Sequence, residues 1–135
     1  MPFTAVDVVY STELQINHET LAQHFTYKEW IDSVKMVDDL TVVYHLKKPN
    51  VRFKLERYSD NLCGVDYFVP KHIWEKSGDP VTFKNFDLAR GLPMSTGPYI
   101  LYKVTANETI WVRHDDWWAA RTGLKKLPDP KKIIV

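Results

Sequence analysis

The sequence offers few residues that could carry out covalent chemistry, and the segment His114-Asp115-Asp116 is the strongest of them. An imidazole beside two carboxylates has the composition of a general base and its partner. The same aspartates suit the cap of a turn that follows a strand, and we expect that role. No Gly-x-Ser-x-Gly elbow, phosphate-binding glycine-rich loop or dinucleotide fingerprint accompanies them. A hydrolytic enzyme using His114 with Asp115 or Asp116 is therefore the alternative, and we expect no enzyme.

The histidines and the cysteine do not form a recognisable metal site. None of the five histidines has the i, i+4 partner of a His-Glu-x-x-His helix. Cys63 is the only cysteine, so a disulfide and a cysteine-based metal site are excluded, and a small buried residue is the favoured interpretation. We expect no cofactor and no metal.

Two pairs of aromatic residues could contact a ligand without reacting with it. Trp117 and Trp118 are adjacent and could present a ring face to a sugar or to a peptide side chain. Tyr27 and Trp30 precede an extended segment and could do the same. Packing of one ring in the core, with its neighbour half exposed, is the simpler explanation for either pair.

The first half of the chain contains signals for a leading helix, a hairpin and two short helices. Thr4 and Asp7 have the spacing of a capping box, and apolar residues then recur at helical spacing to about residue 16. Residues 17–26 are polar, with a helical turn possible after Thr20. From Trp30 an extended run leads to a turn at Asp38-Asp39, and residues 41–46 alternate as a strand does. Short helices are expected after residues 50 and 70, the latter because Pro70 suits a first helical turn.

The second half predicts an irregular connection followed by another hairpin. Residues 77–96 are rich in turn-forming residues, and a connection of that length usually crosses between subdomains or has a function. After Gly97-Pro98, alternation predicts strands over residues 99–104 and 109–113, then a helical turn over residues 115–120 and a last strand from Lys131. The fold class is thus α+β, with two antiparallel β-hairpins, a leading helix and short connecting helices.

Composition bounds the protein class. A chain of 135 residues with 44% apolar and 26% charged residues has an ordinary globular composition, which excludes disorder and a coiled coil. The net charge of +1 gives no field for nucleic acid, so we expect no nucleic-acid partner. No apolar run is long enough for a membrane span, and no signal peptide opens the chain. The apolar end at residues 133–135 leads us to expect a piece cut from a longer protein.

Five collinear segments resemble one protein family. Residues 2–11 (PFTAVDVVYS) are similar to the "P-[FV]-T-A-x-D-V-[VF]-[YF]-S" helix of family 5 extracellular solute-binding proteins, the peptide-binding receptors of ABC importers. Residues 37–46 resemble the family's "V-D-D-x-T-V-x-F-x-L" hairpin, and residues 69–74 its "[IL]-P-K-H-[IV]-[WY]" segment. Residues 95–99 (STGPY) resemble "G-T-G-P-Y" with Ser95 replacing glycine, and residues 113–118 take the place of "R-N-x-x-Y-W".

The resemblance implies a fragment of a two-lobed periplasmic-binding-protein-like fold, whose lobes close over the ligand. Residues 1–76 would be part of a peripheral subdomain, 77–96 the crossing connection, and 97–135 part of the first-lobe sheet. The motif residues would be mainly structural: Thr4, Asp7, Asp38, Asp39, Pro70, Gly97, Pro98 and Tyr99.

By the same resemblance, the expected function is the substrate-binding component of an ABC-type importer. It would capture a peptide or an oligosaccharide outside the cytoplasmic membrane and work with ABC permease subunits. The parent protein would be periplasmic or extracellular and membrane-associated. The segment alone would bind weakly, because much of the clamp is missing. A stand-alone interaction domain is a further alternative.

A truncated sheet has a physical consequence for this segment. Strands that lack their neighbours leave open edges, and we expect the last apolar strand to have no partner within the chain. Open edges favour strand exchange between copies, so the fragment is expected to self-associate.

Overall fold

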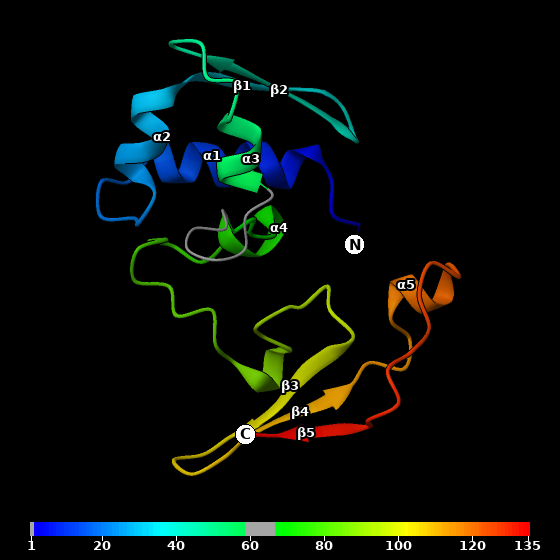
Figure 1. The fold of residues 1–135 in the computed structure, drawn as a ribbon. Helices are drawn as coiled ribbons and strands as arrows, with labels where there is room; N and C mark the ends of the chain where they lie inside the picture. The colour runs from blue at the N-terminus through cyan, green and yellow to red at the C-terminus, as the bar shows by residue number, and fades with distance from the viewer. Residues whose placement is uncertain (1, 59–66) are drawn as a thin grey trace. The chain divides into compact units, whose positions relative to one another are not determined.

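The computed structural model describes residues 2–58 and 67–135, and the chain divides into two compact units, Met1–Phe83 and Lys84–Val135 (Figure 1). The boundary between the units falls inside the connection expected over residues 77–96. Cys63, expected to be buried, lies outside the described residues. Helices and small antiparallel sheets confirm the α+β class. Among residues 2–58 and 67–135, no helix combines the length and hydropathy that crossing a bilayer requires.

The first unit begins with helix α1 (Ala5–Asn17), as the capping signal predicts. Helix α2 (His24–Trp30) follows and is a full element where the sequence suggested only a helical turn. The His24 side chain is buried, with 2% of its surface exposed, and its Nδ1 lies 3.0 Å from the carbonyl oxygen of Gln15 at the end of α1. This tertiary contact and the burial of Tyr27 in the core connect α2 to the rest of the unit, and apolar periodicity alone did not reveal the helix.

Strands β1 (Ile31–Asp38) and β2 (Thr41–Leu46) form the predicted first hairpin. They pair antiparallel, with Val34 opposite Tyr44. At the turn the Asp38 carboxylate accepts a hydrogen bond from the Leu40 amide (2.8 Å), and this bond is the main reason that the pKa of Asp38 is lowered. The turn is therefore closed by a local side-chain contact, as its composition suggests.

Two short helices and a small core complete the described part of this unit. Helix α3 (Phe53–Tyr58) and helix α4 (Lys71–Trp74) occupy the places expected after residues 50 and 70. The core cluster consists of Tyr27, Ile31 and Phe53. Residues from α1, α2, β2 and α3 pack around it, namely Ile16, Trp30, Tyr44, Leu46 and Tyr58. The hairpin and the first three helices are thus joined by one apolar cluster.

The second unit contains a three-stranded antiparallel sheet in the order β3-β4-β5. Strands β3 (Tyr99–Val104) and β4 (Thr109–Arg113) form the predicted hairpin, preceded by a single 3-10 turn, η1 (Leu88–Arg90), and followed by helix α5 (Trp118–Arg121). Strand β5 (Lys132–Ile134) pairs with β4, with Ile134 opposite Ile110. The expectation that the last strand has no partner within the chain is therefore wrong: the preceding loop returns it to β4.

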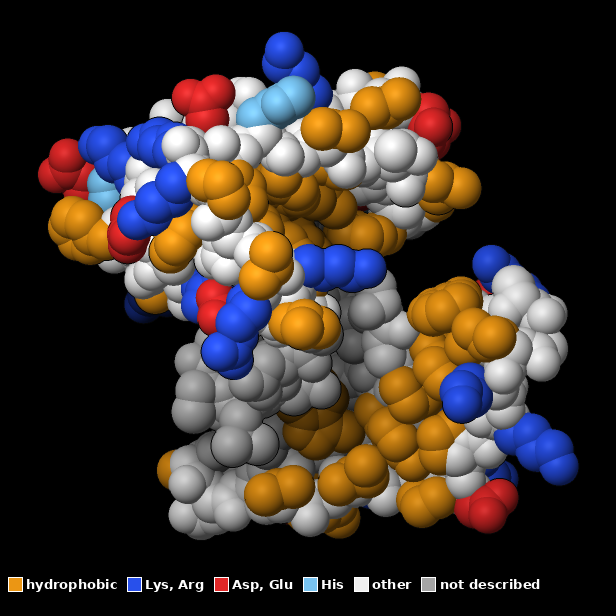
Figure 2. All heavy atoms as spheres, turned by 45° about the horizontal axis from the view of Figure 1, so that its top comes forward, with side chains coloured by type: hydrophobic (Ala, Val, Ile, Leu, Met, Phe, Trp, Pro, Cys, Tyr) orange, Lys and Arg blue, Asp and Glu red, His pale blue; other side chains and the backbone are white. Residues whose placement is uncertain are grey.

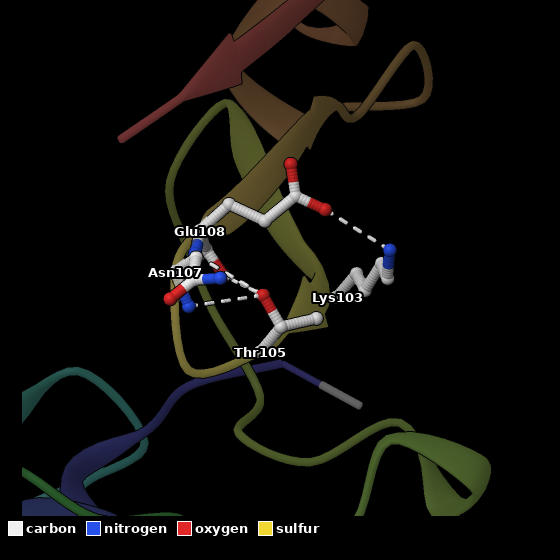
Figure 3. A network of polar contacts seen from close by, with 4 residues as sticks. All are labelled: Lys103, Thr105, Asn107 and Glu108. Carbon is white, nitrogen blue, oxygen red and sulfur yellow. Dashed lines mark hydrogen bonds and ion pairs between the residues drawn. The ribbon is translucent and has the colours of Figure 1, made fainter.

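The turn between β3 and β4 is held by polar contacts (Figure 3). The Thr105 hydroxyl accepts hydrogen bonds from the backbone N–H groups of Asn107 (3.3 Å) and Glu108 (3.1 Å). Beside it the Lys103 ammonium pairs with the Glu108 carboxylate at 3.0 Å. Short-range bonds of this kind set the turn and thereby the register of the two strands.

Candidate functional site

Asp7 joins the two helical motifs of the first unit. Its carboxylate is buried, with 6% of the residue exposed, and Oδ2 accepts a hydrogen bond from the Thr4 amide at 3.0 Å, which caps α1. The other oxygen, Oδ1, accepts from the Lys71 amide at 2.9 Å, directly after Pro70. One carboxylate therefore accepts from the N-cap amide of α1 and from the first amide of α4, and Asp7 and Lys71 are 64 residues apart in the sequence.

Ser11 and Asp39 make further links to α1. The Ser11 hydroxyl donates to the Asp7 carbonyl oxygen (2.7 Å) and accepts from the Val69 amide (2.8 Å), one helical turn beyond the Asp7 contact. At the N-terminal end of α1, the Ala5 amide donates to the carbonyl oxygen of Asp39 in the hairpin turn (2.8 Å). Thr4, Asp7, Asp39 and Pro70 thus lie where three sequence motifs meet around α1, in positions that stabilise the unit.

Gly97, Pro98 and Tyr99 lie at the start of β3, where the second unit is tied together. The Pro98 carbonyl accepts from the His114 amide (2.8 Å), and the Tyr99 hydroxyl donates to the Pro130 carbonyl (2.8 Å). These two bonds join the strand to the segments on either side of α5. The motif is therefore a structural junction of the unit.

Trp117 and Trp118 pack in the same place. Both indole N–H groups donate to one acceptor, the Thr96 carbonyl oxygen, each at 2.9 Å. The rings meet nearly edge to face, with centroids 6.1 Å apart. Trp118 keeps 47% of its surface exposed, whereas Trp117 is half-buried. The polar edge of each ring is thus bonded within the unit, while part of the Trp118 ring stays exposed.

The other expected ligand pair, Tyr27 and Trp30, packs in or beside the core of the first unit. Tyr27 is 3% exposed and belongs to the core cluster, so its burial contradicts a role as an open platform. Trp30 is half-buried at the edge of that cluster, and the Lys48 ammonium lies 4.2 Å from its ring centroid. Lys48 also pairs with Glu29 at 2.9 Å. Core packing and a cation over the ring account for both residues.

The hydrolytic alternative finds no support in the geometry. The Asp115 carboxylate pairs with the Arg113 guanidinium at 2.6 Å, and the Asp116 carboxylate lies 3.4 Å from the Arg121 guanidinium. The backbone carbonyl oxygen of His114 accepts a hydrogen bond from the Trp117 amide at 2.9 Å. In the described part of the chain, no hydrogen bond joins its imidazole to either carboxylate, and no group of three or more metal-ligating side chains occurs.

One concave region was missed by the sequence reasoning. It lies in the first unit and is lined by side chains of α1 and of the segment from Trp74 onward. Tyr10, Glu13 and Asn17, spaced i, i+3 and i+7 on α1, line it together with Glu75. That spacing of polar residues along one helix face is the signal that could have revealed it.

Comparison with known proteins gives a family match over the whole chain. The model of bacterial extracellular solute-binding proteins, family 5 Middle, matches residues 1–135. No curated protein sequence matches the chain.

Several solved structures share the fold. The periplasmic oligopeptide-binding protein of an oligopeptide ABC transporter from Thermotoga maritima is 24% identical with a TM-score of 0.74, and the match covers 99% of this chain and 23% of that one. Its mannohexaose-bound structure gives the same values. HbpA2 from Haemophilus parasuis is 25% identical (TM-score 0.65; 98% and 26% covered). DppA from Helicobacter pylori, in complex with the peptide STSA, is 20% identical (TM-score 0.65; 100% and 26% covered).

The chain therefore spans about a quarter of the length of these solved structures. The Thermotoga and Helicobacter proteins carry names of binding proteins. Its two small sheets and connecting helices match a fragment of a periplasmic-binding-protein fold. The family match runs through all five motif segments, including those that meet at α1 and at the start of β3. The chain belongs to the bacterial extracellular solute-binding proteins of family 5.

Proposed function

We propose that this chain is part of the substrate-binding component of an ABC-type importer. The carrying observation is the family match over residues 1–135, supported by the fold shared with an oligopeptide ABC transporter protein. The parent protein would capture its solute outside the cytoplasmic membrane, in the periplasm or at the cell exterior, and deliver it to permease subunits. Reversible closure of two lobes would provide capture and release without a chemical step.

We propose a peptide or an oligosaccharide as the cargo. The solved neighbours include one bound to mannohexaose and one bound to the peptide STSA, so the fold accommodates both classes. Within this chain Trp118 is the best candidate contact, because 47% of its surface is exposed while its N–H group is anchored on Thr96. An anchored ring is a rigid platform, and a rigid platform loses little conformational entropy when a sugar or an apolar side chain stacks on it.

We assign the two ends of the chain to different parts of the parent. Residues 1–76 would belong to a peripheral subdomain, residues 77–96 to the crossing connection and residues 97–135 to the first-lobe sheet. The division of the contacts between Phe83 and Lys84 supports an assignment to two structural regions. Since the chain spans 23% of the Thermotoga protein, the segment alone would bind cargo weakly.

Calorimetric titration of the full-length protein that contains this segment tests the proposal. Peptides and β-linked oligosaccharides are the two ligand panels, and saturable binding without turnover of either is expected. Trp118→Ala should weaken binding about tenfold, because an aromatic contact contributes about 1 kcal/mol beyond its area, whereas Trp118→Phe should retain most of it. Turnover of a ligand would show an enzyme, and binding of a protein partner alone would show an interaction domain.

We also propose that the segment self-associates. Because β5 pairs with β4, the argument now rests on the outer strands of the sheet. Strands β3 and β5 are the outer strands of their sheet, and apolar side chains on them are exposed, among them Ile100, Tyr102 and Ile134. Figure 2 shows how widely apolar side chains reach the surface of the molecule. Sedimentation velocity should show a concentration-dependent dimer of the segment, and a monomer at high concentration would contradict it.

A further inference from the structure

The first unit contains an open pocket that the proposed function does not use. It has a volume of about 430 Å³ and lies between the C-terminal half of α1 and the residues at and after the end of α4. This volume is within the range of pockets that take small molecules. All of its lining residues belong to the first unit, so the pocket does not depend on where the second unit lies.

The pocket is electrostatically negative. Glu13 and Glu75 line it, and among the residues that the structure describes neither carboxylate takes part in an ion pair or a side-chain hydrogen bond. The last turn of α1 borders the pocket and contains no basic residue, so the negative end of the helix dipole is not compensated there. His18 is the one lining side chain that can carry a positive charge.

The pKa of the Tyr10 phenol is consistent with a negative pocket. Burial raises the pKa of Tyr10, and the nearby Glu75 carboxylate raises it further. Glu75 is an exposed residue, yet its carboxylate lies near enough to the Tyr10 phenol to act on it. A positive charge placed between these groups would offset both the carboxylate and the helix terminus.

Two aromatic rings also line the pocket. Tyr10 and Trp74 both line the pocket, and Trp74 is held by an edge-to-face contact with Phe83, with centroids 5.1 Å apart. A fixed aromatic face beside carboxylates favours an organic cation, which gains from both the ring and the charge. The same unit already contains such an arrangement, because the Lys48 ammonium lies over the Trp30 ring and pairs with Glu29.

A bare metal ion fits this region less well. No group of three or more histidine, cysteine, aspartate or glutamate side chains in residues 2–58 and 67–135 could hold one. The volume is also far larger than a metal ion with protein ligands requires, whereas an amine with a small hydrocarbon body fills such a space.

We propose that this pocket binds a small organic monocation, with the ammonium group at Glu13 and Glu75 and the hydrocarbon body against Tyr10 and Trp74. The site is separate from the aromatic contact at Trp118 and does not depend on the proposed import function. It would give the protein a second ligand specificity, for primary amines, carried entirely by α1 and the region around α4.

A matched pair of probes tests the proposal on the 135-residue chain. Cyclohexylamine is protonated at neutral pH, and cyclohexanol has the same shape without the charge. In a titration followed by ¹H–¹⁵N NMR, the amine should shift the signals of residues 10–18 and 74–80 with a Kd on the order of 1 mM. The alcohol should bind at least about tenfold more weakly, because it lacks the charge that the carboxylates attract.

Isosteric variants separate a built site from general attraction between charges. Glu13→Gln and Glu75→Gln should each weaken amine binding by about fivefold to tenfold. Glu56→Gln on α3 removes the same charge from an exposed residue paired with Arg52, and it should leave the affinity unchanged. Retained dispersion of the NMR spectrum shows that each variant is folded. Equal binding of amine and alcohol, equal loss in all three variants, or no shifts in residues 10–18 would each overturn the proposal.

Discussion

The contact most sensitive to a single substitution is the double cap made by Asp7. Replacing Asp7 by alanine removes the acceptor for the Thr4 amide and for the Lys71 amide, at 3.0 Å and 2.9 Å. A hydrogen bond to a charged group contributes about 1.5–3 kcal/mol, and both amides are part-buried, so the lower end applies to each. The free energy of unfolding of the first unit should therefore fall by about 3 kcal/mol.

Native-state hydrogen exchange measures this loss in the first unit without interference from the second. Slowly exchanging amides of α1, β1 and β2 report the opening free energy of their own unit. A loss of about 3 kcal/mol speeds their exchange by about two orders of magnitude, while the amides of β3 and β4 should keep their rates. Asp7→Asn retains one carbonyl acceptor and should cost about half as much.

An exposed aspartate of the same unit provides the control. Asp32 lies on β1 with its side chain exposed, so Asp32→Ala should change the stability by no more than about 0.5 kcal/mol. If Asp7→Ala destabilises the unit no more than Asp32→Ala does, the link between α1 and α4 does not stabilise the fold. Faster exchange in β3 and β4 as well would show that the effect is not confined to this unit.

Three further predictions concern the tryptophan pair and two titrating groups. Trp117→Phe and Trp118→Phe should each destabilise the second unit by about 1 kcal/mol in hydrogen exchange, because each removes one N–H group from the shared carbonyl; no loss in the double variant would contradict this. The pKa of Tyr10 is raised in the folded state, so the stability that Tyr10 contributes below pH 10.0 is lost as the pH rises through its folded-state pKa. Replacing the nearby carboxylate, Glu75→Gln, should make this alkaline loss of stability smaller in a series of urea titrations. The lowered pKa of Asp38 means that stability present above pH 3.8 is lost as the pH falls through the folded value, and its carboxyl ¹³C signal should titrate below 3.8.

Local signals predicted the elements whose cause is local. The Thr4 and Asp7 spacing predicted the start of α1, since a capping box needs only residues within one helical turn. Alternation predicted β2 and the second hairpin, because the side-chain period of a strand is visible in the chain itself. Helix α2 was largely missed, because its buried residues pack against distant segments: His24 lies against the end of α1 and Tyr27 lies in the core cluster.

For the candidate ligand residues too, the sequence and the tertiary structure supplied different information. Aromatic composition singled out Tyr27 and Trp118 equally, because a sequence shows ring type but not exposure. Packing buried the first and left the second open. The pocket beside Tyr10 and Glu75 combines residues from two distant segments, so no single motif marked it.

By itself, the sequence determined the class of the fold, its family and the order of its elements apart from α2, because these depend on periodicity, turn residues and motif order along the chain. Only the tertiary structure decided which distant groups meet. The Asp7 carboxylate reaches an amide 64 residues away, β5 returns to pair with β4, and the Thr96 carbonyl receives both indoles. The physical reason is that such contacts satisfy buried donors and acceptors across long separations, and a linear pattern specifies that a donor needs a partner but not which one.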